Sequence, residues 1–293
     1  MIMKNTIARI GAPMMALMLL FGCAGQSKEK SVKTVNADVA TVQKQQNDSD
    51  MLSTIELDGM KVTWIRDNAN DRVMPLSLFP DATKAQIDSL SLQDGVPASV
   101  STFLVEKDGK WMLFDTGMGA PDSKLPEGLK SLNVNPADID YLFITHFHGD
   151  HIGGMMKDGN PVFPNAEVYV SKMEYDAWMK MPADKKSQVE STMKAYDARL
   201  HQFSFGDTLP CNVVAMEAAG HTPGHTVFQT GKLLVVGDLM HGAALQLKYP
   251  EICATYDMDK SGAVKSRKHY VQYAREKGLV IAGMHLPVPA FMK

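Results

Sequence analysis

The run HFHGDH at residues 146–151 is the feature that most constrains how this chain can fold. It stands directly behind the apolar run YLFI at residues 141–144, which predicts a buried strand, and two glycines follow at residues 153–154. Histidine and aspartate side chains are unfavourable in a core unless each has a partner. We therefore expect the cluster on a loop that leaves the end of a strand, where glycine lets the backbone bend sharply.

Beyond residue 50 the chain alternates β-type and helical segments. β-Branched and aromatic residues predict strands at residues 60–67, 100–115, 140–145, 166–171, 212–220, 226–238 and 278–283. A hairpin turn is expected at Asp108-Gly109, inside the second of these segments. Helix-forming composition and capping residues predict helices at residues 81–90, 171–180, 183–200 and 259–278. This alternation favours an α/β class in which sheets are layered with helices.

Length and charge narrow the class of protein. The 293 residues suit one large domain or two modest ones, and 45% hydrophobic residues can furnish a sizeable core. The formal net charge is -3, and no basic stripe stands out. We therefore expect no nucleic-acid partner, and the expected ligand is a small-molecule substrate.

Residues 1–23 have the pattern of an export signal. Lys4 and Arg9 precede an apolar stretch at residues 10–22 that is too short to span a bilayer as a helix of the mature protein. The stretch ends in LLFGC, which resembles the lipobox of bacterial lipoproteins, with Cys23 as the lipidated residue. This resemblance implies several acyl chains and an exported chain anchored on the periplasmic or cell-surface side of a bacterial membrane. The alternative is an ordinary secretory signal with an incidental cysteine.

Residues 24–50 are polar, lack aromatic residues and cannot bury enough apolar surface to offset the entropy of ordering. We expect a disordered tether there and a globular domain at residues 51–293, held to the membrane by the lipid anchor only. Cys211 and Cys253 lie in this domain. They could form a disulfide or serve as two small buried side chains, and the sequence leaves both options open.

Four separated stretches carry side chains that suit a metal centre, each just beyond a predicted strand. Imidazole nitrogens and carboxylate oxygens are the ligands that zinc and related divalent ions prefer. The first two histidines of the cluster can approach one ion, and the aspartate and histidine that follow can face a second ion beside it. The alternative is that these are unrelated surface or core histidines. This is a poor explanation, because a cluster this dense rarely arises by chance in a chain with only 9 histidines. The candidate ligands are His146, His148, Asp150, His151, His221, Asp238 and His285.

These residues resemble the metallo-β-lactamase-fold hydrolase superfamily. The similarity runs from residue 96 to residue 289 and rests on the motifs LFDTGMG, ITHFHGDHIGG, GHTPGHT, VVGDL and MHLPVP. It implies an αββα four-layer sandwich, in which two facing mixed β-sheets are flanked by helices and the metal site lies at one edge. It also implies two divalent ions, with zinc as the first choice and iron or manganese as alternatives. The implied ligands are His146, His148 and His221 for the first ion, Asp150, His151 and His285 for the second, and Asp238 as the bridge.

The ligand set favours some branches of the superfamily over others. Zinc β-lactamases with a cysteine ligand lack counterparts of His151 and Asp238, and flavodiiron oxidoreductases carry glutamate in place of His148. Hydroxyacylglutathione hydrolases and tRNA-processing nucleases share the ligand set. The stretch from His221 to Pro289 most resembles the branch that holds N-acyl-homoserine lactone lactonases and methyl parathion hydrolase.

One position departs from that branch. Its lactonases commonly carry a tyrosine three residues beyond the bridging aspartate, and this chain has His241 there. The His241 imidazole either donates a hydrogen bond to a developing oxyanion or lines the pocket. We regard His241 and Asp150 as candidate catalytic residues, with Asp150 passing on a proton. Asp115 and His225 are interpreted as supporting residues that do not contact the metal.

The resemblance implies a hydrolase in which a hydroxide that bridges two zinc ions cleaves a small ester-like substrate. The expected substrate is a lactone or other carboxylic ester in the first place and a phosphotriester in the second. The alternatives are a mononuclear iron oxidoreductase of the persulfide dioxygenase type and a non-catalytic metal-binding module. Residues 74–99 leave a further choice, since they could form a flap, a homodimer contact or, through Leu76, Leu78 and Phe79, plain core.

Overall fold

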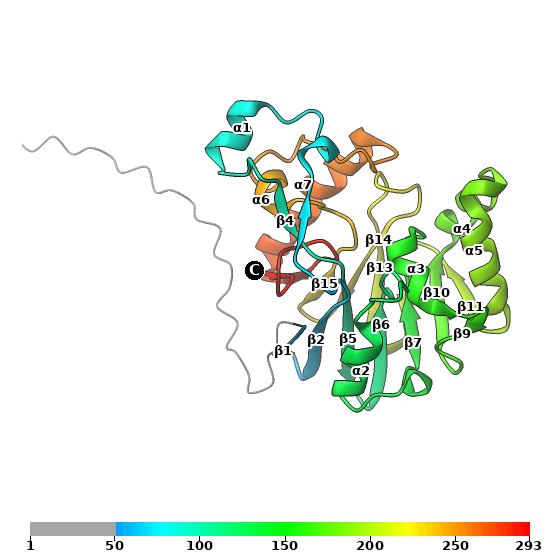
Figure 1. Ribbon diagram of the computed structural model, residues 1–293. Helices are drawn as coiled ribbons and strands as arrows, with labels where there is room; N and C mark the ends of the chain where they lie inside the picture. Colours follow the sequence, from blue (N-terminus) through cyan, green and yellow to red (C-terminus); the bar gives the residue numbers. More distant parts are fainter. Residues whose placement is uncertain (1–50) are drawn as a thin grey trace, which may run out of the picture. The chain divides into compact units, whose positions relative to one another are not determined.

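The computed structural model describes residues 51–293 (Figure 1). The predicted export signal, Cys23 and the predicted tether lie outside the described residues. Two sheets form the centre of the described part. The first has seven strands in the order β1 (Leu52–Leu57), β2 (Met60–Arg66), β5 (Ser101–Lys107), β6 (Lys110–Phe114), β7 (Tyr141–Phe143), β10 (Glu167–Ser171) and β11 (Leu200–Phe203). The second has six strands in the order β12 (Thr208–Leu209), β13 (Val213–Glu217), β14 (Thr226–Thr230), β15 (Leu233–Val235), β16 (Val280–Ala282) and β17 (Phe291–Met292).

The two sheets face each other across the main hydrophobic core. Phe103 and Val105 of β5 pack in this core with Phe228 of β14, whereas Leu104, between them in sequence, packs in a separate core with Leu142 of β7. Successive side chains of a strand point to opposite faces of a sheet, so the seven-stranded sheet is apolar on both faces. Its outer face therefore needs a cover.

Helices provide that cover. Leu129, Trp178 and Met193 pack in the outer core of the seven-stranded sheet, and Tyr270 donates a hydrogen bond to the Glu217 carbonyl of the six-stranded sheet at 2.6 Å. Figure 1 shows the helices outside the paired sheets. The predicted αββα sandwich is confirmed. The helices that carry these side chains are α2 (Leu125–Ser131), α4 (Lys172–Met179), α5 (Ala183–Ala195) and α7 (Lys260–Lys277).

Local sequence signals account for several element ends, whereas the strand predicted at residues 226–238 is a hairpin of β14 and β15. Asp108 and Gly109 have φ values of 52° and 72° and form the predicted hairpin turn between β5 and β6. Gly278 caps α7 with a left-handed φ of 62°. The helix predicted to run to residue 200 ends at residue 195 instead, because a 3-10 turn at Asp197–Arg199 replaces the α-helical hydrogen bonds before Leu200 begins β11.

The segment at residues 74–99 forms a small core of its own. Strands β3 (Arg72–Met74) and β4 (Val96–Ala98) pair as an antiparallel hairpin, with α1 (Lys84–Ser89) between them in sequence. Leu78 and Phe79 are buried beside α6 (Ala243–Gln246), and Leu76 packs against the same cluster. The sequence predicts Leu76, Leu78 and Phe79 either in a flap or homodimer contact or in plain core, and they pack in the core.

Cys211 and Cys253 are free thiols, the first half-buried and the second buried. Within residues 51–293, no helix combines the length and the apolar character needed to cross a bilayer.

Candidate metal centre

Loops that leave the ends of four strands carry the candidate ligands. β7 leads to His146 and His148, and the short helix α3 (Gly149–Ile152) follows. The other ligands lie just beyond the ends of β13, β15 and β16. Because β7 is parallel to β6 and β10, and β15 is parallel to β16, these loops emerge at the same edge of each sheet. Residues that are far apart in sequence thereby meet.

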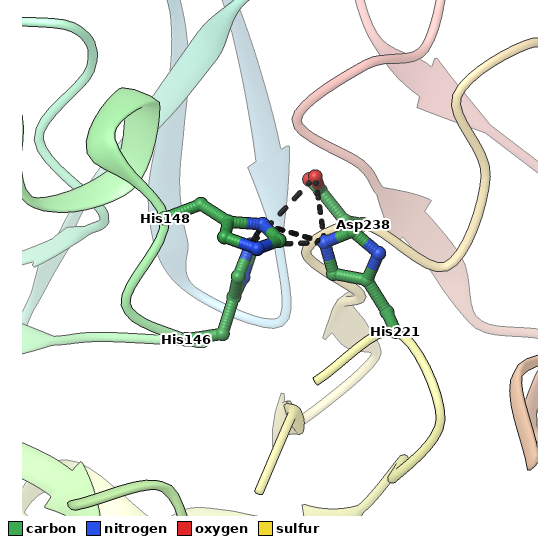
Figure 2. A group of neighbouring side chains, drawn as sticks. All are labelled: His146, His148, His221 and Asp238. Carbon is green, nitrogen blue, oxygen red and sulfur yellow. Dashed lines mark hydrogen bonds and ion pairs between the residues drawn. The ribbon is translucent and has the colours of Figure 1, made fainter. Parts of the chain in front are cut away.

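Three imidazole nitrogens converge in the first group of ligands (Figure 2). His146 Nε2 lies 3.0 Å from His148 Nδ1, and His221 Nε2 lies 3.2 Å from the former and 2.9 Å from the latter. Asp238 Oδ2 lies 3.3 Å from His221 Nε2. Three imidazole nitrogens and a carboxylate oxygen around one point match the donor set of a zinc site.

The second group consists of Asp150, His151 and His285, and Asp238 connects it to the first. Asp150 Oδ2 lies 3.3 Å from His285 Nε2, and Asp150 Oδ1 lies 3.7 Å from His151 Nε2. Asp238 Oδ1 lies 3.1 Å from His151 Nε2, and Asp238 Oδ2 lies 3.1 Å from His285 Nε2. The structure therefore brings all the predicted ligands together, with one carboxylate between the two groups.

The polar chemistry of the cluster fits bound cations. His151 Nε2 and Asp238 Oδ1 are buried, and neither has a hydrogen-bond partner within the described chain. Unpaired buried polar atoms are costly, and a cation held between these two atoms would satisfy both. Burial lowers the pKa of His146 well below its ordinary value and that of His148 to about 3, so both rings are neutral and able to bind a cation near neutral pH. Burial raises the pKa of Asp238, but the adjacent histidines, His151 first, outweigh it and hold the pKa well below its ordinary value.

Asp115 and His225 support the ligands from outside the cluster. Asp115 Oδ2 lies 2.6 Å from His151 Nδ1, and its Oδ1 accepts a hydrogen bond from the Thr145 backbone at 2.8 Å. His225 Nδ1 donates to the Ala218 carbonyl at 3.1 Å, which leaves His225 Nε2 to accept from the Asp238 backbone N–H at 3.1 Å. Both residues orient candidate ligands through hydrogen bonds.

Sequence reasoning missed a second supporting carboxylate, Asp257. Its Oδ1 lies 3.1 Å from His221 Nδ1, and its Oδ2 accepts from the guanidinium of Arg267 at 3.3 Å. Arg267 is fully buried on α7 and also donates to the Leu239 carbonyl at 2.9 Å, one residue beyond Asp238. One sequence signal could have indicated this pair. Arg267 lies at helical spacing from the apolar residues of α7, which places an arginine on the buried face of the helix.

Glu174 was also missed, although it joins two of the ligand loops. Its Oε1 accepts hydrogen bonds from the Phe147 backbone at 3.1 Å and from the Trp178 indole at 2.6 Å. Its Oε2 accepts from the Thr222 hydroxyl at 2.9 Å and from the Gly224 backbone at 2.7 Å. Glu174 is buried, and burial raises its pKa against the opposing effect of these donors. In sequence it looks like an ordinary residue of the first turn of a capped helix.

Gly153 and Gly154 are needed for a reason other than the bend expected from the sequence. A Cβ atom on Gly153 would lie 2.1 Å from the Met118 carbonyl oxygen, and one on Gly154 would lie 2.0 Å from the Thr116 carbonyl oxygen. Neither glycine has a positive φ. Close approach to the loop after β6 is therefore the constraint.

His241 is buried beside the bridging carboxylate. Its Nε2 lies 3.1 Å from Asp238 Oδ2, and neither ring nitrogen has a hydrogen-bond partner within the described chain. The ring stacks on that of His285, with centroids 5.2 Å apart, and its other neighbours include the exposed Tyr256. With 1% of its surface exposed, His241 faces the metal cluster and is not part of the wall of the cavity described next.

A cavity of about 510 Å³ opens onto the cluster. This size suits a small molecule. One side of the wall is formed by the candidate ligands His148, Asp150, Asp238 and His285. The rest is formed by Arg72, Met74, Met118, Gly149, Gln188 and Tyr256.

Two local sequence relatives support a metal-dependent hydrolase. The chain is 38% identical to a probable metallo-hydrolase of Methanocaldococcus jannaschii over 64 residues, which are 22% of this chain and 29% of the relative. It is 45% identical to ribonuclease Z of Nanoarchaeum equitans over 47 residues, or 16% of this chain and 13% of the relative. The chain thus spans less than a third of the length of these relatives.

Solved structures match far more of the chain. The hydrolase AbOPH of the beta-lactamase superfamily superposes with a TM-score of 0.73 at 29% identity, covering 83% of this chain and 93% of that one. AidC, a dizinc quorum-quenching lactonase solved with the product N-hexanoyl-L-homoserine, superposes with a TM-score of 0.75 at 26% identity, covering 82% and 92%. The family model of the metallo-beta-lactamase superfamily matches residues 95–285, the part that holds both sheets' ligand loops. The chain therefore belongs to the metallo-beta-lactamase superfamily.

Proposed function

We propose that this protein is a dinuclear zinc hydrolase that cleaves a small ester-like substrate, with a lactone or other carboxylic ester as the first choice and a phosphotriester as the next. The observation that carries the proposal is the position of Asp238, whose two carboxylate oxygens face both groups of ligands. The similarity to a dizinc lactonase supports the same metal pair and substrate class.

The residues of the cluster have separate tasks in this reaction. Bound divalent cations supply a Lewis acid and lower the pKa of a water molecule to about 7. Asp238 stays ionised between the ligand groups, and His225 fixes its backbone. Asp150 lines the cavity with 28% of its side chain exposed, so it is the carboxylate that can take a proton from the nucleophile and pass it to the leaving group.

Metal analysis and a substrate panel test the proposal. We expect about two zinc ions per chain in the purified protein, as for a two-metal site. The panel contains chromogenic lactones, carboxylic esters, a phosphotriester, a cephalosporin and the phosphodiester bis(4-nitrophenyl) phosphate, and we expect the lactones and esters to give the highest kcat/KM. One iron per chain with oxidation of a persulfide would support the dioxygenase alternative. Metal binding without turnover of any substrate would support the non-catalytic module.

We further propose that the chain is exported and anchored through lipid on Cys23, with no other membrane contact and no nucleic-acid partner. The lipobox-like sequence and the net charge of -3 support this placement. A homodimer remains a prediction, to be checked by light scattering.

A further inference from the structure

One permanently charged side chain lines the metal cavity without belonging to the ligand set. This side chain is Arg72, at the start of β3. The other charged residues in the wall, Asp150 and Asp238, are engaged by ligand histidines. We propose that Arg72 makes the cavity select an ester or lactone that carries a second, anionic group, a carboxylate or a phosphate. The inference rests on the proposed function and names its substrate class.

The backbone holds Arg72 firmly at the cavity. Arg72 pairs with Ala98 across the β3–β4 hairpin, and the carbonyl of the next residue, Ser99, accepts a hydrogen bond from His285 Nδ1 at 2.8 Å. Met74, two residues further along β3, is buried in the core of this segment. The hairpin that carries Arg72 therefore leads directly into the backbone that holds the candidate ligand His285, and this connection places Arg72 beside the cluster.

The guanidinium has no partner within residues 51–293. Arg72 Nε is buried and makes no hydrogen bond, and no carboxylate lies within ion-pair distance. The neighbouring acid, Asp71, pairs with Arg66 instead, at 3.1 Å. A partly buried cation without a counter-charge is unfavourable, and an anion in the cavity would correct this.

The chemistry of the wall indicates what kind of anion would bind. A guanidinium binds planar carboxylates and phosphates through paired hydrogen bonds. Met74 and Met118 lie in the same wall and reduce the solvation of such a pair. A substrate that fits therefore presents its scissile carbonyl to the ligand cluster and its anionic end to β3.

A matched pair of esters tests the inference. The anionic probe is 4-nitrophenyl hydrogen adipate, and the neutral probe is 4-nitrophenyl 6-methylheptanoate, in which an isopropyl group replaces the carboxylate. The glutarate and suberate hemiesters vary the distance between the two ends. For the native protein we expect a higher kcat/KM for at least one hemiester than for its neutral counterpart.

Substitutions then assign the preference to Arg72. Arg72→Gln should lower the ratio of kcat/KM for the anionic ester over the neutral ester about 10- to 100-fold, as expected for loss of a charge-assisted hydrogen bond. Arg72→Lys should keep part of the preference, and Arg72→Glu should reverse it. Arg275→Gln, an exposed position at the end of α7, is the matched control and should leave the ratio unchanged.

Binding of adipate, followed by calorimetry, separates this inference from the proposed function. We expect Arg72→Gln, and not Arg275→Gln, to weaken adipate binding. If the native protein hydrolyses neither these esters nor any member of the substrate panel, the proposed function is wrong, and adipate binding still reports on Arg72. If Arg72→Gln changes both esters equally and leaves adipate binding intact, the assignment of Arg72 is overturned.

Discussion

The Nε2 atom of His225 accepts a hydrogen bond from the backbone N–H of Asp238 at 3.1 Å. A histidine outside the ligand set therefore fixes the position of the carboxylate that lies between the two ligand groups. The pairing also determines the tautomer of His225, because its Nδ1 must carry the proton that is donated to the Ala218 carbonyl. Other residues outside the candidate ligand set also hold ligand side chains or loops in place through hydrogen bonds.

Protonation of His225 should destabilise the metal-free protein. Burial lowers the pKa of His225 to about 3, below the ordinary 6.5. The unfolded chain therefore binds a proton at a pH where the folded chain does not, and stability is lost as pH falls below 6.5. The loss is at most about 1.4 kcal/mol per pH unit for one histidine. Urea unfolding in the presence of a chelator, from pH 7.5 to pH 5, measures it.

The control for this experiment is a second histidine variant. We expect His225→Gln to reduce the pH slope of the unfolding free energy, and His269→Gln, at an exposed position of α7, to leave it unchanged. An identical slope in both variants and the native protein would show that His225 does not cause the acid sensitivity.

Asp238→Ala should lose metal and activity together. No other carboxylate contacts both ligand groups, as far as residues 51–293 are concerned. We expect the metal content to fall from about two ions per chain to about one or fewer, with loss of ester hydrolysis. Elemental analysis and turnover are measured on the same sample, with Asp122→Ala, an exposed position, as control. Full metal content with normal turnover would contradict the bridging position.

Glu174→Gln should destabilise the fold and loosen two ligand loops. The carboxylate accepts from backbone N–H groups of Phe147 and Gly224, each next to or near a ligand histidine. An amide would set its own N–H₂ group against two of the four donors, at a cost of about 1–3 kcal/mol. Thermal unfolding should show Tm lowered by several degrees, whereas Glu190→Gln on the exposed face of α5 should not change it. An unchanged Tm for Glu174→Gln would rule out this clamp.

The lipid anchor is tested through Cys23. We expect the native chain in the detergent phase of a Triton X-114 partition, and Cys23→Ser in the aqueous phase, because acyl chains on this residue are the expected source of membrane affinity. Cys211→Ser serves as control. Recovery of Cys23→Ser in the detergent phase would refute lipidation at this residue.

The convergence of the candidate ligands could be predicted from the sequence because each of them is marked locally. His146 and His148 stand directly behind a strand-forming run, and His285 follows the last predicted strand. Loops at the ends of strands in layered sheets meet at an edge, so the type of residue and its place after a strand carry most of the information.

The supporting residues could not be predicted in the same way, because their partners are distant in sequence. Glu174 contacts Thr222 and Gly224, and Asp257 contacts His221, across separations of 36 to 50 residues. Nothing in the residues that surround either carboxylate in sequence indicates these partners. Arg72 is similar, since only the pairing of β3 with β4 brings it to the cavity. Such contacts depend on the packed fold.

Asp257→Ala should weaken metal binding without removing a ligand. Asp257 orients the imidazole of His221 through Nδ1 at 3.1 Å and is itself held by the buried Arg267. Loss of such a supporting carboxylate commonly reduces metal affinity about 10- to 100-fold, because the ring is less basic and less well oriented. Competition with a fluorescent zinc chelator measures the affinity, and Asp257→Asn, which keeps an acceptor oxygen, should recover part of it. Asp122→Ala controls for loss of a surface carboxylate. An affinity equal to that of the native protein in Asp257→Ala would mean that the backbone alone orients His221.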